Sequence, residues 1–244
     1  MGESGSGKST AVQLLAGTLV GYEGDVLLSE MPSGMQDEVL GTMLSSAAPD
    51  DSETLKSHQI RDLTAASLTR EISIVSAHSH LFAGTLRDNL LMARADATDN
   101  ELWQTLEAAH IDDFVRAQSR GLDMPITQDG ANLSGGQKQR LSLARALADN
   151  PSILIMDDTT SAVDMETEAE IQRHLRDLDE KKTIVTIAHR ISSVKDSDLI
   201  LVLEHGRIVE RGTHDELVAS HGRYWQIYSK QLGVDAGRSQ GFEA

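Results

Sequence analysis

The chain has 244 residues, which suffices for one large α/β domain or two small ones. Acidic residues outnumber basic ones by 38 to 22, and the net charge of −16 argues against a broad electrostatic grip on nucleic acid or an anionic membrane. The absence of cysteine excludes disulfides, a thiol nucleophile and a cysteine-type zinc site. No segment approaches the roughly 18 apolar residues that a membrane-spanning helix needs.

The first quarter of the chain alternates short elements with an irregular stretch. Residues 10–20 carry apolar side chains at helical spacing and predict a helix, and residues 25–28 predict a short strand. Residues 29–58 mix Ser, Pro, Gly and acids, which indicates an irregular insertion. The β-branched residues 72–75 predict a further strand.

The middle of the chain is dominated by predicted helices. Residues 84–128 are expected to be mostly helical, including 100–110 and 112–117, and another helix is expected over 137–148. The continuous apolar run 153–156, bounded by Pro and two acids, is typical of a strand buried on both faces of a parallel sheet.

The last third continues the alternation. A helix is expected over 165–178, followed by strands over 183–188 and 199–203. His205-Gly206 predicts a hairpin turn, Thr213 to Glu216 predicts a capping box, and the polar segment 233–244 predicts a disordered tail. Alternating strands and helices predict an α/β fold with a mostly parallel sheet covered by helices on both faces.

The strongest chemical signal is the glycine-rich motif GESGSGKST at residues 2–10. Glycines at this spacing let backbone N–H groups curl around phosphate oxygens, and the helix that follows adds its positive N-terminal end. Lys8 would reach the β- and γ-phosphates, and the hydroxyl of Ser9 would ligate Mg²⁺. The residues expected to bind nucleotide here are Gly2, Glu3, Ser4, Gly5, Ser6, Gly7, Lys8, Ser9 and Thr10.

Two further motifs suit a nucleotide site. Asp157 ends the buried strand 153–156 and could hold Mg²⁺ through water, and the adjacent Asp158 could orient an attacking water. In the segment 133–137, Ser134 predicts a helix start at which two glycines expose backbone N–H groups, which is an anion-binding element. Taken alone, these motifs also suit a solvated acidic turn and an ordinary capped helix.

Together the motifs resemble the ATP-binding cassette (ABC) family. Residues 2–10 are similar to its Walker A loop, 153–158 to its Walker B strand, and 161–164 to its D-loop. His189 is similar to the switch histidine of the family, and Leu133, Ser134, Gly135, Gly136 and Gln137 are similar to its signature. The resemblance covers residues 2–232. It implies that ATP and Mg²⁺ are bound, with the signature and Asp164 completing a site shared between two such domains.

The resemblance implies a P-loop NTPase (RecA-like) core with an inserted α-helical subdomain. Residues 1–82 would form the first part of the core, 83–136 the helical subdomain, and 137–232 the second part. Segments 81–89, 187–193 and 212–217 resemble ABC exporters in particular. That likeness implies a transmembrane domain as a partner, contacted through coupling helices near residues 76–89, and a second nucleotide-binding domain.

The chain departs from the family pattern in three places. It begins at the P-loop, so the preceding strand and most of the N-terminal β-subdomain are missing, and we expect a fragment or a mis-assigned start. The catalytic Glu of the family is replaced by Asp158, which is one methylene shorter. The Q-loop Gln is replaced by Ala77, for which His78 or His80 could substitute. In this family, replacement of the catalytic Glu by Asp marks the degenerate ATP site, the less active one, of a heterodimeric exporter.

The sequence thus predicts the ATPase domain of an ABC exporter with weak catalysis at its own site by Asp158 and His189. We expect it at the cytoplasmic face of a bacterial plasma membrane, in a heterodimer, without nucleic acid. Two alternatives stay open, namely a regulatory module that binds ATP without hydrolysing it and a soluble ABC ATPase of DNA repair or translation. The transported substrate and the partner's identity do not follow from the sequence.

Overall fold

A computed structural model describes residues 1–3, 5–29, 57–76, 80–158, 163–176 and 182–233. The chain divides into two compact units, each described by itself below. Unit 1 comprises the described parts of residues 1–64 and 188–244, and unit 2 those of residues 65–187.

Unit 1 contains the P-loop, its helix and two antiparallel strand pairs. Its elements are α1 (Lys8–Leu15), β1 (Leu27–Ser29), β2 (Ser57–Gln59), η1 (Ile60–Asp62), η4 (Ile191–Ser193), β8 (Ile200–Glu204), β9 (Arg207–Gly212), α9 (His214–Ala219) and α10 (Arg223–Leu232). Strand β1 pairs with β2, and β8 pairs with β9. The apolar core comprises Met1, Ala188, Ile191, Val194, Ile200, Val202, Leu217 and Tyr224.

The β8–β9 hairpin and the start of α9 confirm two local sequence predictions. His205 (φ 49°) and Gly206 (φ 76°) are both left-handed, as the two-residue turn between right-twisted strands requires. Thr213 accepts from the backbone N–H of Glu216, while the Glu216 carboxylate accepts from the backbone N–H of Thr213. Both features depend on residues close in the sequence, which explains why pattern alone found them.

Unit 2 is built around a parallel sheet. Its elements are α3 (Ala65–Glu71), β3 (Ile72–Ser76), β4 (Gly84–Thr85), α4 (Leu86–Leu91), α5 (Asp99–Ala108), α6 (Asp112–Arg116), η2 (Gly121–Asp123), β5 (Pro125–Ile126), η3 (Gln128–Gly130), α7 (Gly135–Ala148), β6 (Ile153–Asp157), α8 (Met165–Arg176) and β7 (Thr183–Ile187). The strand order is β3-β6-β7, and β4 and β5 form a short antiparallel pair.

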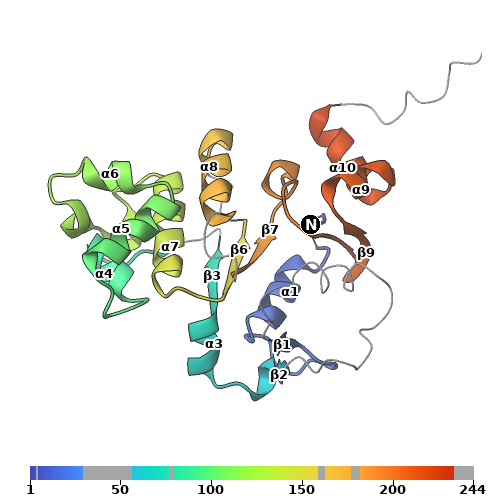
Figure 1. Cartoon of the computed structure of the whole chain (residues 1–244), viewed down its shortest axis with the longest axis horizontal. Helices are drawn as coiled ribbons and strands as arrows, with labels where there is room; N and C mark the ends of the chain where they lie inside the picture. Colours follow the sequence, from blue (N-terminus) through green and yellow to red (C-terminus); the bar gives the residue numbers. More distant parts are fainter. Residues whose placement is uncertain (4, 30–56, 77–79, 159–162, 177–181, 234–244) are drawn as a thin grey trace, which may run out of the picture. The chain divides into compact units, whose positions relative to one another are not determined.

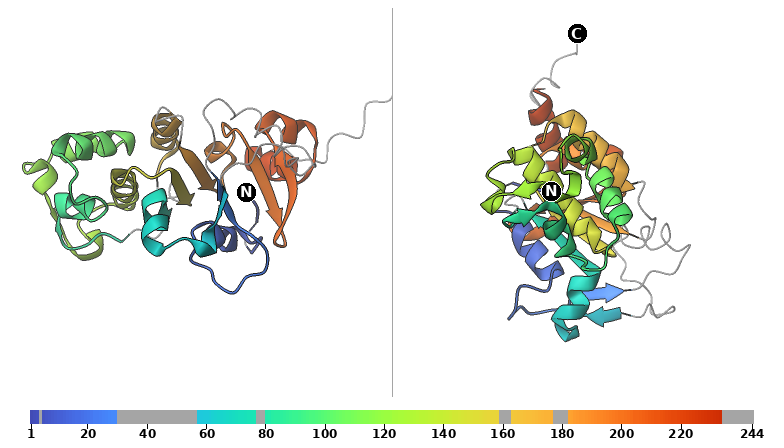
Figure 2. Two further views of the ribbon diagram at one scale, coloured as in Figure 1. Left: turned by 60° about the horizontal axis from the view of Figure 1, so that its bottom comes forward. Right: turned by 90° about the vertical axis from the view of Figure 1, so that its left-hand side faces the viewer.

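The central strand β6 is the most deeply buried element of the sheet. Leu154, Ile155 and Met156 are each at most 2% exposed, as expected for a parallel strand covered on both faces. Figure 1 shows the three strands side by side with α7 and α8 next to them. Within unit 2, α4, α5 and α6 gather on the side of α7 away from β7 (Figures 1 and 2). This arrangement confirms the predicted α/β fold with a parallel sheet.

Several predicted boundaries were wrong by a few residues. The first helix ends at Leu15 rather than near residue 20, because Gly17 (φ 65°) adopts a left-handed conformation that breaks it. The first strand covers 27–29 instead of 25–28. The segment 29–58 is not irregular at its ends, where Ser29 and residues 57–58 pair as strands. Its remaining residues and the expected tail 234–244 lie outside the described part of the chain.

Candidate functional site

The P-loop of unit 1 wraps around the amino group of Lys8. Its Nζ donates to the main-chain oxygens of Gly2 and Glu3, both at 2.7 Å, and lies 3.4 Å from Oγ of Ser6. Lys8 is 9% exposed although it is charged, and Ser6 is 5% exposed. The loop therefore holds a cation at its centre, as a phosphate cradle requires.

The glycines of the loop are there for steric reasons. A Cβ on Gly2 (φ 154°) would lie 2.3 Å from the main-chain oxygen of Leu203. Gly7 caps α1 in a left-handed conformation (φ 102°), and a Cβ there would lie 3.2 Å from Cα of Gly206. Side chains at these two positions would push the loop off the β8–β9 hairpin. Ser9 and Thr10 are exposed in the first turn of α1. The backbone N–H groups of this first turn have no acceptor within the helix.

The P-loop is anchored on β8 through the residue that precedes it. The amino group of Met1 donates to the oxygen of Leu201 at 2.6 Å, and the N–H of Leu203 donates to the oxygen of Met1 at 2.7 Å. The N–H of Gly206 donates to the oxygen of Ser6 at 2.9 Å. These bonds join residues about 200 positions apart, so no local pattern in the sequence predicts them.

An ion pair network flanks the loop. Arg223 on α10 lies 2.8 Å from a carboxylate oxygen of Glu3 and 3.4 Å from one of Glu204. The cavity that these groups line has a volume of about 60 Å³.

The predicted Walker B residues of unit 2 lie at the end of the central strand. Asp157 is the last residue of β6, in register with Ser76 of β3 and Ile187 of β7. Its carboxylate is thus placed at the carboxyl edge of a parallel sheet, where α/β folds bind ligands. Asp158 follows with a left-handed backbone (φ 51°), and its N–H donates to the oxygen of Ile187 at 2.9 Å. Aspartate tolerates this conformation better than most residues.

The signature segment opens α7 as the sequence predicts. Ser134 accepts from the N–H of Gln137 at 3.2 Å, and the Gln137 side chain accepts from the N–H of Ser134 at 2.9 Å. Ser134 and Gly135 are exposed, whereas Leu133 is buried and anchors the turn. An exposed helix N-terminus of this kind can receive an anion.

Asp164 caps the next helix, α8. One of its carboxylate oxygens accepts from the N–H of Thr167 and the other from the Thr167 hydroxyl, both at 2.9 Å. The bond from the Thr167 backbone is the largest cause that lowers the pKa of Asp164 below its usual value. This aspartate is therefore held ionised at the position where α8 begins.

Of the other expected site residues, His189 and His80 lie within the described part of the chain. His189, in unit 1, accepts a bond from the side chain of Gln231 at its main-chain oxygen, at 2.7 Å. Nδ1 of His80 lies 3.2 Å from a carboxylate oxygen of Asp129, with both side chains exposed. Ser4, Ala77, His78 and Ser161 lie outside the described residues.

The segment 81–85 and the first turn of α4 are tightly bonded to each other. The Asn89 side chain is 1% exposed; it accepts from the N–H of Phe82 and donates to the oxygens of Phe82 and Thr85, at 2.8 to 2.9 Å. Thr85 and Asp88 form a capping box at the start of α4. Phe82 is 53% exposed. The loop therefore fixes its own backbone while it presents an aromatic side chain to the surroundings.

The family model of the ABC transporter matches residues 1–161 of this sequence. The chain belongs to the ABC transporter family. The sequence-based assignment to this family and the predicted P-loop fold are thereby confirmed.

Relatives of the ABC protein include the uncharacterized ABC transporter ATP-binding protein YwjA of Bacillus subtilis. The two are 39% identical over 233 residues, which cover 96% of this chain and 36% of the relative. A Staphylococcus aureus protein with a provisional name as a multidrug export ATP-binding/permease protein is 43% identical over 174 residues, which cover 71% of this chain and 30% of the relative. The ABC chain thus spans about a third of the length of these relatives.

A solved structure is also similar to the ABC chain. It is a bacterial Atm1-family ABC exporter with ATP bound, with a TM-score of 0.79 and 33% sequence identity. The similarity covers 94% of this chain and 36% of that one. In the described part of the ABC chain, no helix combines the length and apolarity needed to cross a bilayer.

Proposed function

We propose that the chain is the ATP-hydrolysing domain of an ABC exporter, and that it powers export by ATP-driven dimerisation with a second nucleotide-binding domain. The observation that carries the proposal is the P-loop, in which two main-chain oxygens hold the Lys8 amino group at the centre of a glycine cradle. The similarity to an Atm1-family exporter and to a protein provisionally named for multidrug export supports the transport role.

The residues present fit a magnesium–triphosphate group. Lys8 supplies the fixed charge, and Gly5 (φ 78°) has no neighbouring atom within 4 Å of where a Cβ would stand, so phosphate oxygens can approach its backbone. Ser9 and Asp157 are the proposed magnesium ligands. Residues 2–10 would hold the phosphates, and a bound magnesium ion would supply positive charge beside them.

We propose that Leu133, Ser134, Gly135, Gly136 and Gln137 act on the ATP of the partner domain, together with Asp164. The exposed N-terminus of α7 supports this role, because its N–H groups can receive a γ-phosphate presented from outside the chain. In this arrangement each site takes its P-loop from one domain and its signature from the other, so the isolated chain is nearly inactive.

The chain's own site is proposed to hydrolyse ATP weakly. Asp158 orients the attacking water with a carboxylate that is one methylene shorter than glutamate, and His189 contacts the γ-phosphate. A misplacement of about 1 Å can cost roughly 100-fold in rate. Ala77 cannot supply a magnesium ligand. These features favour a heterodimer in which the partner's P-loop site does most of the work and uses the intact signature of this chain.

The transmembrane partner is proposed to dock near residues 76–89, where the exposed Phe82 ring supports an apolar contact. Residues 83–136 would form the helical subdomain between core segments 1–82 and 137–232. The domain would then act at the cytoplasmic face of a plasma membrane, most simply a bacterial one, since the relatives compared above are bacterial.

Binding of a fluorescent ATP analogue with Mg²⁺ tests the proposal. Lys8→Ala removes the fixed cation and should abolish binding, whereas the control Lys195→Ala removes an exposed lysine of the same unit and should leave it unchanged. Circular dichroism reports whether each variant is folded. Unchanged affinity in folded Lys8→Ala protein would contradict the assignment of residues 2–10.

A further inference from the structure

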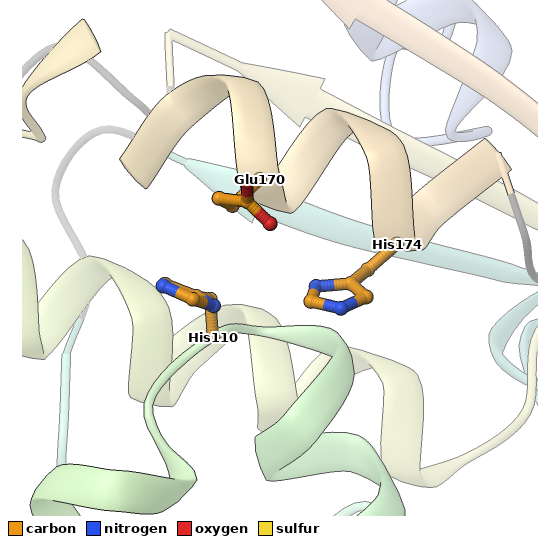
Figure 3. Close-up of side chains that lie close together, drawn as sticks. All are labelled: His110, Glu170 and His174. Carbon is orange, nitrogen blue, oxygen red and sulfur yellow. The ribbon is translucent and has the colours of Figure 1, made fainter. Parts of the chain in front are cut away.

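A three-residue cluster of metal-ligating side chains lies within unit 2, away from the Walker and signature motifs in the sequence. His110 follows α5, and Glu170 and His174 stand one turn apart on α8. One ligand atom from each of the three lies within 4.8 Å of the other two. Figure 3 shows the three side chains facing the same space between α8 and the turn after α5.

We propose that His110, Glu170 and His174 form a binding site for a late first-row divalent metal, with Zn²⁺ as the best match. Two imidazoles and one carboxylate are a ligand set that zinc accepts, with water in the fourth position. Imidazole nitrogens disfavour Mg²⁺ and Ca²⁺, which take oxygen ligands. In a tetrahedral zinc site, neighbouring donor atoms lie roughly 3.5 Å apart. Side-chain rotations that move the three ligand atoms by about 1 Å would therefore bring them to that spacing.

The polar atoms of the cluster support a ligand role. Nδ1 of His174 is buried and has no hydrogen-bond partner among the residues that the structure describes. A buried imidazole nitrogen without a partner is costly, and a metal ion or a proton donor would satisfy the position. The two histidine rings approach with a centroid separation of 5.8 Å at an interplanar angle of 31°.

The backbone holds His110 in place. The N–H of His110 donates to Glu107 and that of Ile111 to Leu106, a pattern that ends α5 with a left-handed residue (φ 53°). Arg140 of α7 donates to the main-chain oxygen of His110 at 2.6 Å. Glycine is the usual residue at such a position, so a histidine there brings a side chain to α8 at some cost in backbone energy.

One neighbouring charge opposes the ion. Arg173 forms an ion pair with one carboxylate oxygen of Glu170. The metal would use the other oxygen or displace the guanidinium. A bound ion would join the end of α5 to α8 and stabilise unit 2 against unfolding, because ligands that bind only the folded state do so.

The experiment measures Zn²⁺ binding to the full chain, stripped of metal and without nucleotide, by competition with a chromogenic chelator. Millimolar Mg²⁺ suppresses weak binding to surface carboxylates. We expect one zinc ion per chain and a higher midpoint of thermal unfolding. Co²⁺ in place of zinc should give visible absorption bands of a site with nitrogen ligands.

The variants distinguish residues that bind the metal from residues that only stabilise the fold. His110→Gly suits the left-handed backbone, so the metal-free protein should remain as stable as wild type while zinc affinity falls 10-fold or more. His174→Ala should do the same, and Arg173→Gln should bind zinc more tightly because the competing cation is gone. His58→Ala removes an exposed histidine from unit 1 and serves as the control. The proposal is overturned if wild type binds no more zinc than His110→Gly, or if His58→Ala loses as much affinity.

Discussion

At the scale of single residues, the P-loop shows how backbone geometry and charge act together. The sequence pattern predicts the cradle, because glycine spacing and the following helix are local features. It does not predict how the cradle is supported, since Met1 bonds to β8 and Glu3 pairs with Arg223 of α10. Contacts between residues this far apart depend on tertiary packing, which no window of the sequence contains.

Asp158 is the residue on which catalysis is proposed to depend most. In the full chain at high protein concentration, Asp158→Glu should raise phosphate release from Mg-ATP by about 10- to 100-fold, because the longer side chain brings the carboxylate to the water. If the missing Gln at position 77 limits the magnesium shell, the gain will require Asp158→Glu combined with Ala77→Gln.

Two results would count against this account of Asp158. Wild-type protein that hydrolyses ATP as fast as Asp158→Glu would show that the site is not impaired. If wild-type protein hydrolyses ATP at a rate typical of an active domain and Asp158→Ala loses all of that activity, this chain carries the active site itself. Thermal unfolding checks that glutamate is tolerated at the left-handed backbone of position 158.

At the scale of elements, short capping motifs are the most predictable features of this chain, because each needs only four residues. The Thr213–Glu216 capping box was found from sequence alone, whereas the metal-ligating cluster was not. Glu170 and His174 at one-turn spacing in the predicted helix 165–178 were a usable signal, but nothing in the sequence placed His110 opposite them.

Asn89 fixes the loop that precedes α4. Asn89→Ala should destabilise unit 2 by about 2 kcal/mol, because the main-chain groups of Phe82 lose their side-chain partners in a buried setting. Urea unfolding followed by far-UV circular dichroism measures the change. Asn100→Ala removes an exposed asparagine from α5 and is the matched control. A change in Asn89→Ala no larger than in the control would contradict the role assigned to these bonds.

Glu101 links the cap of α5 to the acid stability of unit 2. Bonds from Thr98, and then the Arg94 guanidinium, lower the pKa of Glu101 to about 2, against 4.5 for the unperturbed group. A carboxylate with a depressed folded-state pKa contributes stability above its unfolded value, and the contribution is lost as the pH falls from about 4.5 to about 2.

Glu101→Gln should therefore lower the stability at neutral pH and flatten its dependence on pH between about 4.5 and 2. Urea midpoints at pH 7, 4 and 3 measure the slope, and Glu107→Gln, which removes an exposed carboxylate from the same helix, is the comparison. Parallel pH profiles for wild type and Glu101→Gln would show that the cap does not carry this dependence.

At the scale of the whole molecule, the proposed function requires a second domain, because the P-loop and the signature of one chain serve different ATP molecules. Activity should then rise faster than in proportion to protein concentration. This prediction is best examined in the Asp158→Glu background, where hydrolysis is easier to detect. Turnover per chain that does not change with concentration would contradict the shared site.

Ser134→Arg separates the two halves of the site. It places a bulky cation at the exposed start of α7, where the partner's γ-phosphate is proposed to dock, so the concentration-dependent hydrolysis of Asp158→Glu protein should disappear. Affinity of the chain's own P-loop for a fluorescent ATP analogue should stay unchanged. Since Arg also removes the helix cap, Ser134→Ala is the control: it loses the cap, worth about 1 kcal/mol, without adding the cation. Hydrolysis by folded Ser134→Arg, Asp158→Glu protein that is as fast as that of Asp158→Glu alone would show that this helix start does not face a partner's nucleotide.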